Sequence, residues 1–188
     1  CSLVGSEMCI RDSPYAGCDT LASANGMDKI TMKMILRADG IPVVDYVWFT
    51  DRQWFSEKST LTDKIESELG YPVIVKPANL GSSIGIGCAH NREELHRAVE
   101  DAARYASRIL VEHMLADMQE INCSVLGDCN EFQTSVLEEP IKSSEILSYD
   151  AKYLGGDKGT KGMQASAKKF PADLPENETK EIQRLAGE

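Results

Sequence analysis

The chain has 188 residues, 42% of them apolar and 27% charged, a composition typical of a soluble globular protein with one large domain or two small ones. Its net charge of −10 and its lack of a basic cluster argue against a nucleic-acid partner. No apolar run approaches the roughly 20 residues of a membrane-spanning helix, so no membrane association is expected.

The first 13 residues show no hydrophobic period and begin with cysteine instead of methionine. They lack the basic start and long apolar core of a signal peptide, and we interpret them as a non-native leader, with an ordinary helix end or loop as the alternative. The six cysteines are scattered without a Cys-x-x-Cys pair. This spacing favours reduced thiols in the cytoplasm over disulfides and does not indicate a zinc site.

The amino-terminal half predicts two helices with a strand between them. Apolar spacing predicts a helix over 21–38 that stops at Gly40, and β-branched and aromatic residues predict a strand over 41–50 after a break at Pro42. A helix is expected over 62–69, ending at Gly70.

The middle of the chain predicts a strand, a loop and a second strand. The apolar run 73–77 carries Lys76 and stops at Pro77, the loop 81–85 contains two glycines and two serines, and alternation over 84–89 predicts the return strand. Asn91, followed three residues later by glutamate, predicts the start of a helix whose apolar face runs to position 106, and 109–113 predicts a short strand.

The carboxyl-terminal part predicts a hairpin, a long loop and a last helix. Strands over 121–126 and 132–137 flank a turn sequence, 142–168 has little periodicity, and a helix begins near Pro175. The order of helices and strands lacks regular βαβ units and therefore predicts an α+β fold.

The loop 81–85 is the strongest functional signal. Glycine lets the main chain approach anionic oxygens closely, so backbone N–H groups and serine hydroxyls can fold over a polyphosphate while Lys76 reaches it from the strand. The loop lacks the Gly-Lys-Ser/Thr ending of a Walker motif. The alternative is a plain hairpin turn. A lysine that ends an apolar strand also needs an anionic partner or access to water.

Acidic and loop residues further along the chain are weaker candidates. Glu112 and Glu120 can accept hydrogen bonds from an adenine amine and ribose hydroxyls, but each alone reads more simply as an exposed carboxylate at a sheet edge. The segment 149–153 lies in the long loop, where a lysine can move onto a γ-phosphate when the loop closes. The alternative is a solvated loop without a ligand. The three histidines are isolated, and no metal or base role is assigned to them.

Assembled, these strings resemble the D-alanine–D-alanine ligase family of the ATP-grasp superfamily. The match covers about residues 14–188 and rests on segments that occur in the same order and spacing, namely 14–18, 21–24 with 27–29, 73–77, 81–85, 120–127 and 149–153. The resemblance implies an ATP-grasp fold of two antiparallel-sheet subdomains. It divides the chain into the leader 1–13, a linking region 14–45, a small subdomain 46–112 and the first part of a large subdomain, 113–188.

The resemblance also implies a reaction and its participants. The carboxylate of one D-alanine attacks the γ-phosphate of ATP, and the amine of a second D-alanine displaces phosphate from the acyl phosphate to give D-alanyl-D-alanine for peptidoglycan. Such chemistry depends on positioning and charge neutralisation. The implied cofactors are ATP and Mg²⁺ or Mn²⁺, the implied location is the cytoplasm, and a homodimer is expected of the complete enzyme.

Site residues follow from the matched segments. The resemblance implies that Lys29 and Lys76 contact the ATP phosphates, that Ser83 covers them and that Lys152 closes on the γ-phosphate. Adenine is expected at Glu112 and at the backbone of 113–115, and ribose at Glu120. The catalytic pair that joins lid to loop and seats the first D-alanine is Ser82 and Tyr153. The full set of ATP contacts is Lys29, Lys76, Ser82, Ser83, Glu112, His113, Leu115, Glu120 and Lys152.

Several departures from the family pattern limit these expectations. The family's amino-terminal strings do not precede Pro14, and its Arg-x-Asp and Glu-x-Asn segments, which supply metal ligands, are expected beyond Glu188. We therefore expect no metal ligands in this chain and no ligase turnover from it alone. His113 stands where lysine or glutamine is common, and 117–119 replaces the usual residues before Glu120. The alternatives are another ATP-grasp carboxylate–amine ligase, a nucleotide-binding module without catalysis and a structural fragment with no ligand.

Overall fold

A computed structural model describes residues 17–115, 118–128, 130–140 and 168–188. The chain divides into two compact units, unit 1 over residues 1–114 and unit 2 over residues 115–188, and each is described by itself. In the part of the chain that the structure describes, no helix is long and apolar enough to cross a membrane.

Unit 1 begins with two helices, α2 (Thr20–Met27) and α3 (Lys29–Ala38). The single helix expected over 21–38 is therefore wrong, because Asp28 adopts an extended backbone and interrupts it. The Asp28 carboxylate accepts a hydrogen bond from the Thr31 N–H at 2.8 Å and so caps α3. The stop predicted at Gly40 is confirmed, since this glycine follows α3 with a φ of 81°.

A four-stranded antiparallel sheet forms the centre of unit 1. Its strands are β1 (Tyr46–Thr50), β2 (Val73–Pro77), β3 (Gly87–Ala89) and β4 (Arg108–His113), in the order β1-β4-β2-β3. β1 begins five residues later than the predicted strand 41–50. Residues just before it bind α3 instead of a strand, as the Val44 carbonyl accepts a hydrogen bond from Lys33. The strand predicted over 84–89 is likewise reduced to its last three residues.

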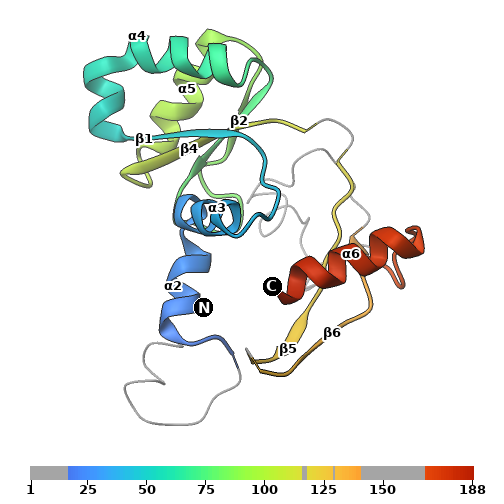
Figure 1. The fold of residues 1–188 in the computed structure, drawn as a ribbon. Coiled ribbons are helices and arrows are strands. Elements are labelled where there is room, and N and C mark those ends of the chain that lie inside the picture. Colours follow the sequence, from blue (N-terminus) through green and yellow to red (C-terminus); the bar gives the residue numbers. More distant parts are fainter. Residues whose placement is uncertain (1–16, 116–117, 129, 141–167) are drawn as a thin grey trace, which may run out of the picture. The chain divides into compact units, whose positions relative to one another are not determined.

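Two helices, α4 (Asp51–Glu68) and α5 (Arg92–Ala102), cover one face of this sheet. Helix α3 lies on the other face (Figure 1). The helix predicted over 62–69 is the last part of α4, which starts earlier, at a capping box between Thr50 and Gln53. Glu57 has non-helical angles inside α4, and this kink breaks the apolar period that would have revealed the whole helix. The Asn91 cap of α5 is confirmed.

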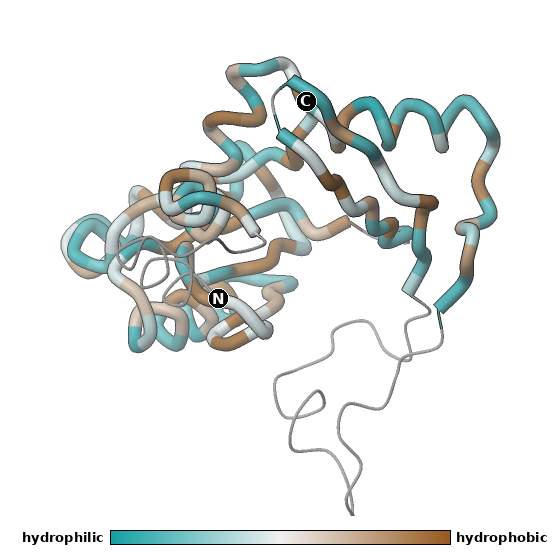
Figure 2. The backbone as a smooth tube through the Cα atoms, turned by 90° about the horizontal axis from the view of Figure 1, so that it is seen from below, coloured by the Kyte–Doolittle hydropathy of each residue, from teal (hydrophilic) through white to brown (hydrophobic). Residues whose placement is uncertain are grey.

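The core of unit 1 lies between the sheet and the helices α4 and α5. Strand alternation sends Ile109 and Val111 of β4 into this core, whereas Leu110 and Glu112 lie on the opposite face with α3. Figure 2 shows how hydrophobic and hydrophilic residues are distributed along the backbone. The core cluster consists of Val47, Phe49, Trp54, Ile65, Val73, Val75, Ala89, Leu95, Ala98, Val99, Ala102, Ile109 and Val111.

Unit 2 contains short strands and one helix in its described residues. The predicted hairpin is confirmed with shorter strands, β5 (Val125–Gly127) and β6 (Phe132–Thr134), and a second pair joins β7 (Glu139–Pro140) to β8 (Lys168–Lys169). The last helix, α6 (Glu176–Gly187), begins directly after Pro175 as expected. Helices with antiparallel sheets confirm the α+β class.

Candidate functional site

The amino-terminal end of α3 is fixed to the sheet by a network around Asp28. One carboxylate oxygen caps the helix at Thr31, and the other accepts a hydrogen bond from the Arg108 guanidinium at 2.7 Å. The Lys29 N–H donates to the Ala78 carbonyl at 2.8 Å. These bonds tie α3 to β4 and to the end of β2, and they place Lys29 and Lys33 on the same side of the helix, one turn apart.

A buried carboxylate between two lysines lies on the face of the sheet that α3 covers. The Glu112 carboxylate receives Lys33 Nζ on Oε1 at 3.0 Å and Lys76 Nζ on Oε2 at 2.5 Å. The side chains of Glu112 and Lys33 are only 8% and 9% exposed, whereas that of Lys76 is 23% exposed. Lys76 thus has the anionic partner that its place on an apolar strand requires.

The position of Glu112 follows from strand register. β4 is an inner strand, and Glu112 stands opposite Tyr46 on β1 and Ile74 on β2. The interpretation of Glu112 as an exposed carboxylate at a sheet edge is therefore wrong. A carboxylate this well buried needs paired cations, which Lys33 and Lys76 supply.

Lys29 holds the segment that leads from β2 into the glycine loop. Its ammonium donates to the carbonyls of Pro77 at 3.2 Å, Ala78 at 3.5 Å and Leu80 at 2.5 Å. Burial, and then the positive charge of Lys76, lower the pKa of Lys29. Among the described residues no carboxylate pairs with Lys29 within 4.0 Å, so its hydrogen-bond partners there are backbone carbonyls.

The glycine loop contains three residues with positive φ angles. Ser82 and Ser83 have φ angles of 54° and 60°, in the left-handed region that residues other than glycine seldom adopt. Gly85 has a φ of 68°, and a Cβ at this position would lie 2.8 Å from both Pro77 Cγ and Tyr105 Cδ2. The loop therefore folds back over the end of β2, and glycine is required where it does so.

The other expected site residues are distributed over different parts of the chain. His113 Nδ1 lies 3.2 Å from the Leu69 carbonyl, so its ring is engaged by the end of α4. Leu115 and Glu120 belong to unit 2 and are exposed. Lys152 and Tyr153 lie outside the described residues. The structure thus brings Lys29, Lys76, Glu112 and the serine loop into one unit, and it leaves the remaining assignments as predictions.

Two site residues, Lys33 and Arg108, were missed by sequence reasoning. Lys33 follows Ile30 by three residues and Lys29 by four, so the helical period places it on the buried face of α3. A charged residue on an apolar helix face was the signal that could have identified it. Arg108 is the first residue of β4, and the sequence carries no comparable local signal there.

The cluster favours an anionic ligand. Two lysines, Lys33 and Lys76, share the Glu112 carboxylate, and a third, Lys29, is close enough for the charge of Lys76 to lower its pKa, in a protein whose overall net charge is −10. This local excess of positive charge next to a tight glycine and serine loop matches what a phosphate group needs. Among residues 17–115, 118–128, 130–140 and 168–188, no group of three or more His, Cys, Asp or Glu side chains could hold a metal ion. The described residues therefore do not fit the divalent cation that the resemblance implies, and no step is assigned to it.

Comparisons with known proteins identify a family. Residues 35–188 match the family model described as D-ala D-ala ligase C-terminus. The chain is 41% identical over 173 residues to the D-alanine–D-alanine ligase of Acetivibrio thermocellus, covering 92% of this chain and 43% of the relative. It is 40% identical over 173 residues to the D-alanine–D-alanine ligase of Enterococcus faecalis, covering 92% and 47% respectively. The chain thus spans about half the length of the curated relatives it matches.

Solved structures agree with this assignment. The fold matches that of the VanG D-Ala:D-Ser ligase from Enterococcus faecalis with a TM-score of 0.77 and 28% identity, covering 98% of this chain and 50% of the other. It also matches the D-alanine–D-alanine ligase from Coxiella burnetii with a TM-score of 0.73 and 25% identity, covering 98% and 45% respectively. These likenesses confirm the predicted ATP-grasp fold.

Proposed function

Because the chain belongs to the D-alanine–D-alanine ligase family, we propose that the protein carrying it uses ATP to join two D-alanines into D-alanyl-D-alanine for peptidoglycan. The observation that supports this most directly is the pair of lysines on buried Glu112, together with Lys29, whose ammonium binds the carbonyls of the segment that leads into the loop 81–85. It supplies positive charge for phosphates and a carboxylate for the purine amine within one unit.

The proposed reaction has two steps. A carboxylate oxygen of the first D-alanine attacks the γ-phosphorus, the bond from that phosphorus to the β-phosphate oxygen breaks, and ADP leaves. The amine nitrogen of the second D-alanine then attacks the acyl carbon, the bond to the phosphate oxygen breaks, and phosphate departs while the amine gives up its proton. Both steps develop or move negative charge, so fixed cations and backbone donors lower their barriers.

Each described residue has a separate proposed part in this reaction. Lys29 and Lys76 bind the phosphates, the former after exchanging its carbonyl partners for phosphate oxygens. Ser83 covers the phosphates, and Glu112 accepts a hydrogen bond from the adenine amine. A carboxylate offers about four acceptor positions, so Glu112 can bind the amine without losing both lysines. Ser82 with Tyr153, Lys152, Glu120 and the backbone at 113–115 keep the roles that the family resemblance implies.

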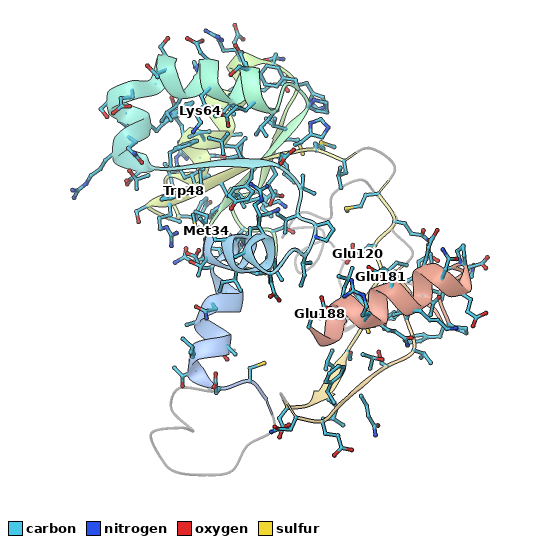
Figure 3. All side chains as sticks on the ribbon, viewed as in Figure 1. Met34, Trp48, Lys64, Glu120, Glu181 and Glu188 are labelled. Carbon is cyan, nitrogen blue, oxygen red and sulfur yellow. The ribbon has the colours of Figure 1, made fainter. Side chains whose placement is uncertain are left out.

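Nucleotide binding tests the proposal directly in this chain. Lys76→Ala removes a charge-assisted hydrogen bond and is expected to weaken ATP binding, measured by calorimetric titration, about tenfold or more. Lys64→Ala is the matched control, because Lys64 is exposed on α4, on the other face of the sheet from α3 (Figure 3). ATP at ~100 times its dissociation constant should stabilise the wild-type chain by about 2.7 kcal/mol. A chain that ATP does not stabilise contradicts the proposal.

The identity of the second substrate needs its own assay, since one structural neighbour is a D-Ala:D-Ser ligase whereas the curated relatives at about 40% identity are D-alanine–D-alanine ligases. In the full-length protein that contains this sequence, ADP release is measured with D-alanine alone and with D-alanine plus D-serine. Turnover with D-alanine alone, slowed by Tyr153→Phe with little change in ATP affinity, is expected. The cytoplasmic location, the divalent cation and a homodimer remain predictions of the same resemblance.

A further inference from the structure

We propose that Lys33 is a positioning residue, which holds the Glu112 carboxylate in place so that the site selects a purine with a 6-amino group. This inference rests on the proposed function, because it concerns the same nucleotide site. Lys33 is the more buried of the two lysines that contact Glu112, and the reaction above gives it no contact with substrate.

Lys33 is a fixed cation. Its Nζ donates to the Val44 carbonyl at 3.2 Å and lies 3.0 Å from Glu112 Oε1. The same ammonium lies 5.3 Å from the centre of the Tyr46 ring, within range of a cation–π interaction. These three partners come from the segment before β1, from β1 and from β4, so Lys33 cannot move without breaking contacts in all of them.

Lys76 is the more exposed cation of the pair. Its side chain is 23% exposed, compared with 9% for Lys33, and it belongs to β2, the strand that leads into the glycine loop. When a triphosphate binds, Lys76 is attracted to the phosphate oxygens as well as to Glu112. The buried carboxylate then depends on Lys33 for both its countercharge and its orientation, because an uncompensated buried charge is strongly unfavourable.

The orientation of this carboxylate determines which base it accepts. Glu112 held by Lys33 keeps acceptor positions open for the donor hydrogens of a 6-amino group. A 6-oxo purine, as in inosine triphosphate, presents an oxygen at that place, and two acceptors repel each other. Without Lys33 the carboxylate is free to follow Lys76, so binding of the amino purine is weakened while binding of the oxo purine is left nearly unchanged.

The test measures dissociation constants for ATP and inosine triphosphate by calorimetric titration of the 188-residue chain. Lys33→Met keeps the length of the side chain but removes its charge, and it should lower the preference for ATP about tenfold, which is ~1.4 kcal/mol. Lys33→Arg keeps the charge and donors and should restore most of the preference. Lys64→Met, the same substitution on the exposed surface of α4, should leave the preference unchanged.

The outcomes separate positioning from a purely structural role. Equal weakening of both nucleotides by Lys33→Met, or no preference for ATP in the wild-type chain, overturns the inference. If far-UV circular dichroism shows that Lys33→Met does not fold, Lys33→Gln, which is polar but also removes the countercharge of Glu112, is measured in its place, and an unchanged ratio again overturns the inference. Failure of the wild-type chain to bind either nucleotide contradicts the proposed function itself.

Discussion

Units 1 and 2 contain similar kinds of secondary structure but bury very different amounts of apolar surface. Unit 1 packs helices against both faces of its sheet, and Phe49 and Trp54 are 1% and 0% exposed. In the described residues of unit 2, Leu137 is the only apolar residue classed as buried, whereas Leu126 and Phe132 are 80% and 47% exposed. Among the described residues, the burial of apolar side chains that drives folding is therefore concentrated in unit 1.

This difference explains why the candidate phosphate site is well defined within unit 1. Lys29, Lys33, Lys76 and Glu112 are positioned by packed strands and by the capped start of α3, before any ligand is bound. In unit 2 the described strands are two or three residues long, and the hairpin amides lie near solvent. A site built on packed elements stays in place, whereas local opening is easier where few apolar contacts oppose it.

The largest expected effect comes from replacing one phenylalanine by alanine in each unit, which tests whether unit 1 is more tightly packed than unit 2. Phe49→Ala empties a buried position that stacks on Trp54, with 5.4 Å between ring centroids, and should cost about 4 kcal/mol. Phe132 touches Gly187 of α6 but is half exposed, so Phe132→Ala should cost only about 1 kcal/mol. Urea unfolding followed by tryptophan fluorescence reports on unit 1, where both tryptophans lie, and hydrogen exchange of the β5–β6 amides reports on unit 2. Equal losses would contradict the comparison.

A pair of glycines in the same loop tests how far the packing of unit 1 extends. Gly85→Ala should destabilise unit 1 by about 2 kcal/mol, because alanine is unfavourable at positive φ and its Cβ would collide with Pro77 and Tyr105. Gly81→Ala, four residues earlier, meets nothing within 4 Å and should change stability by less than about 0.5 kcal/mol. Urea unfolding of both variants measures the difference. A tolerated Gly85→Ala would show that the loop moves independently of the sheet.

The smallest expected effect is a pH dependence confined to unit 1, which contains all three histidines of the chain. Burial, and then the charge of Lys58, lower the pKa of His96, whose Nε2 lies 3.1 Å from Thr62 Oγ1. The unfolded chain therefore binds the proton at higher pH than the folded chain does. The contribution of His96 is complete above its ordinary pKa of 6.5 and is lost as the pH falls through the lowered value.

His96→Gln tests this dependence. The variant should flatten the decline of unit 1 stability as the pH falls below about 6.5, measured by urea unfolding at several pH values. His90→Gln, at an exposed position beside Glu94, is the control and should leave that decline in place. An unchanged slope in His96→Gln would assign the pH dependence to another group.

The sequence predicted those helix ends, turns and strands that are set by residues close to one another in the chain. The cap at Asn91, the stop at Gly40, the hairpin near 127–130 and the strand with Lys76 each depend on one or two turn or cap residues, and each is confirmed. The break between α2 and α3 at Asp28 and the early start of α4 were missed, because the apolar period alone marks neither boundary. The long-range partners Lys33 and Arg108 were missed for a related reason, since their meaning comes from strands that are distant in the sequence.

By itself, the amino-acid sequence determined the family to which the spacing of its motifs points, and it named the candidates for phosphate and purine binding. Only the tertiary structure decided that Glu112 is buried between two lysines, that Lys29 rests on backbone carbonyls and that Lys33 belongs to the same group. The physical reason is that spacing along a chain fixes the face on which a side chain lies. The pairing of charges in a low-dielectric interior depends instead on strand register and on helix placement across the fold.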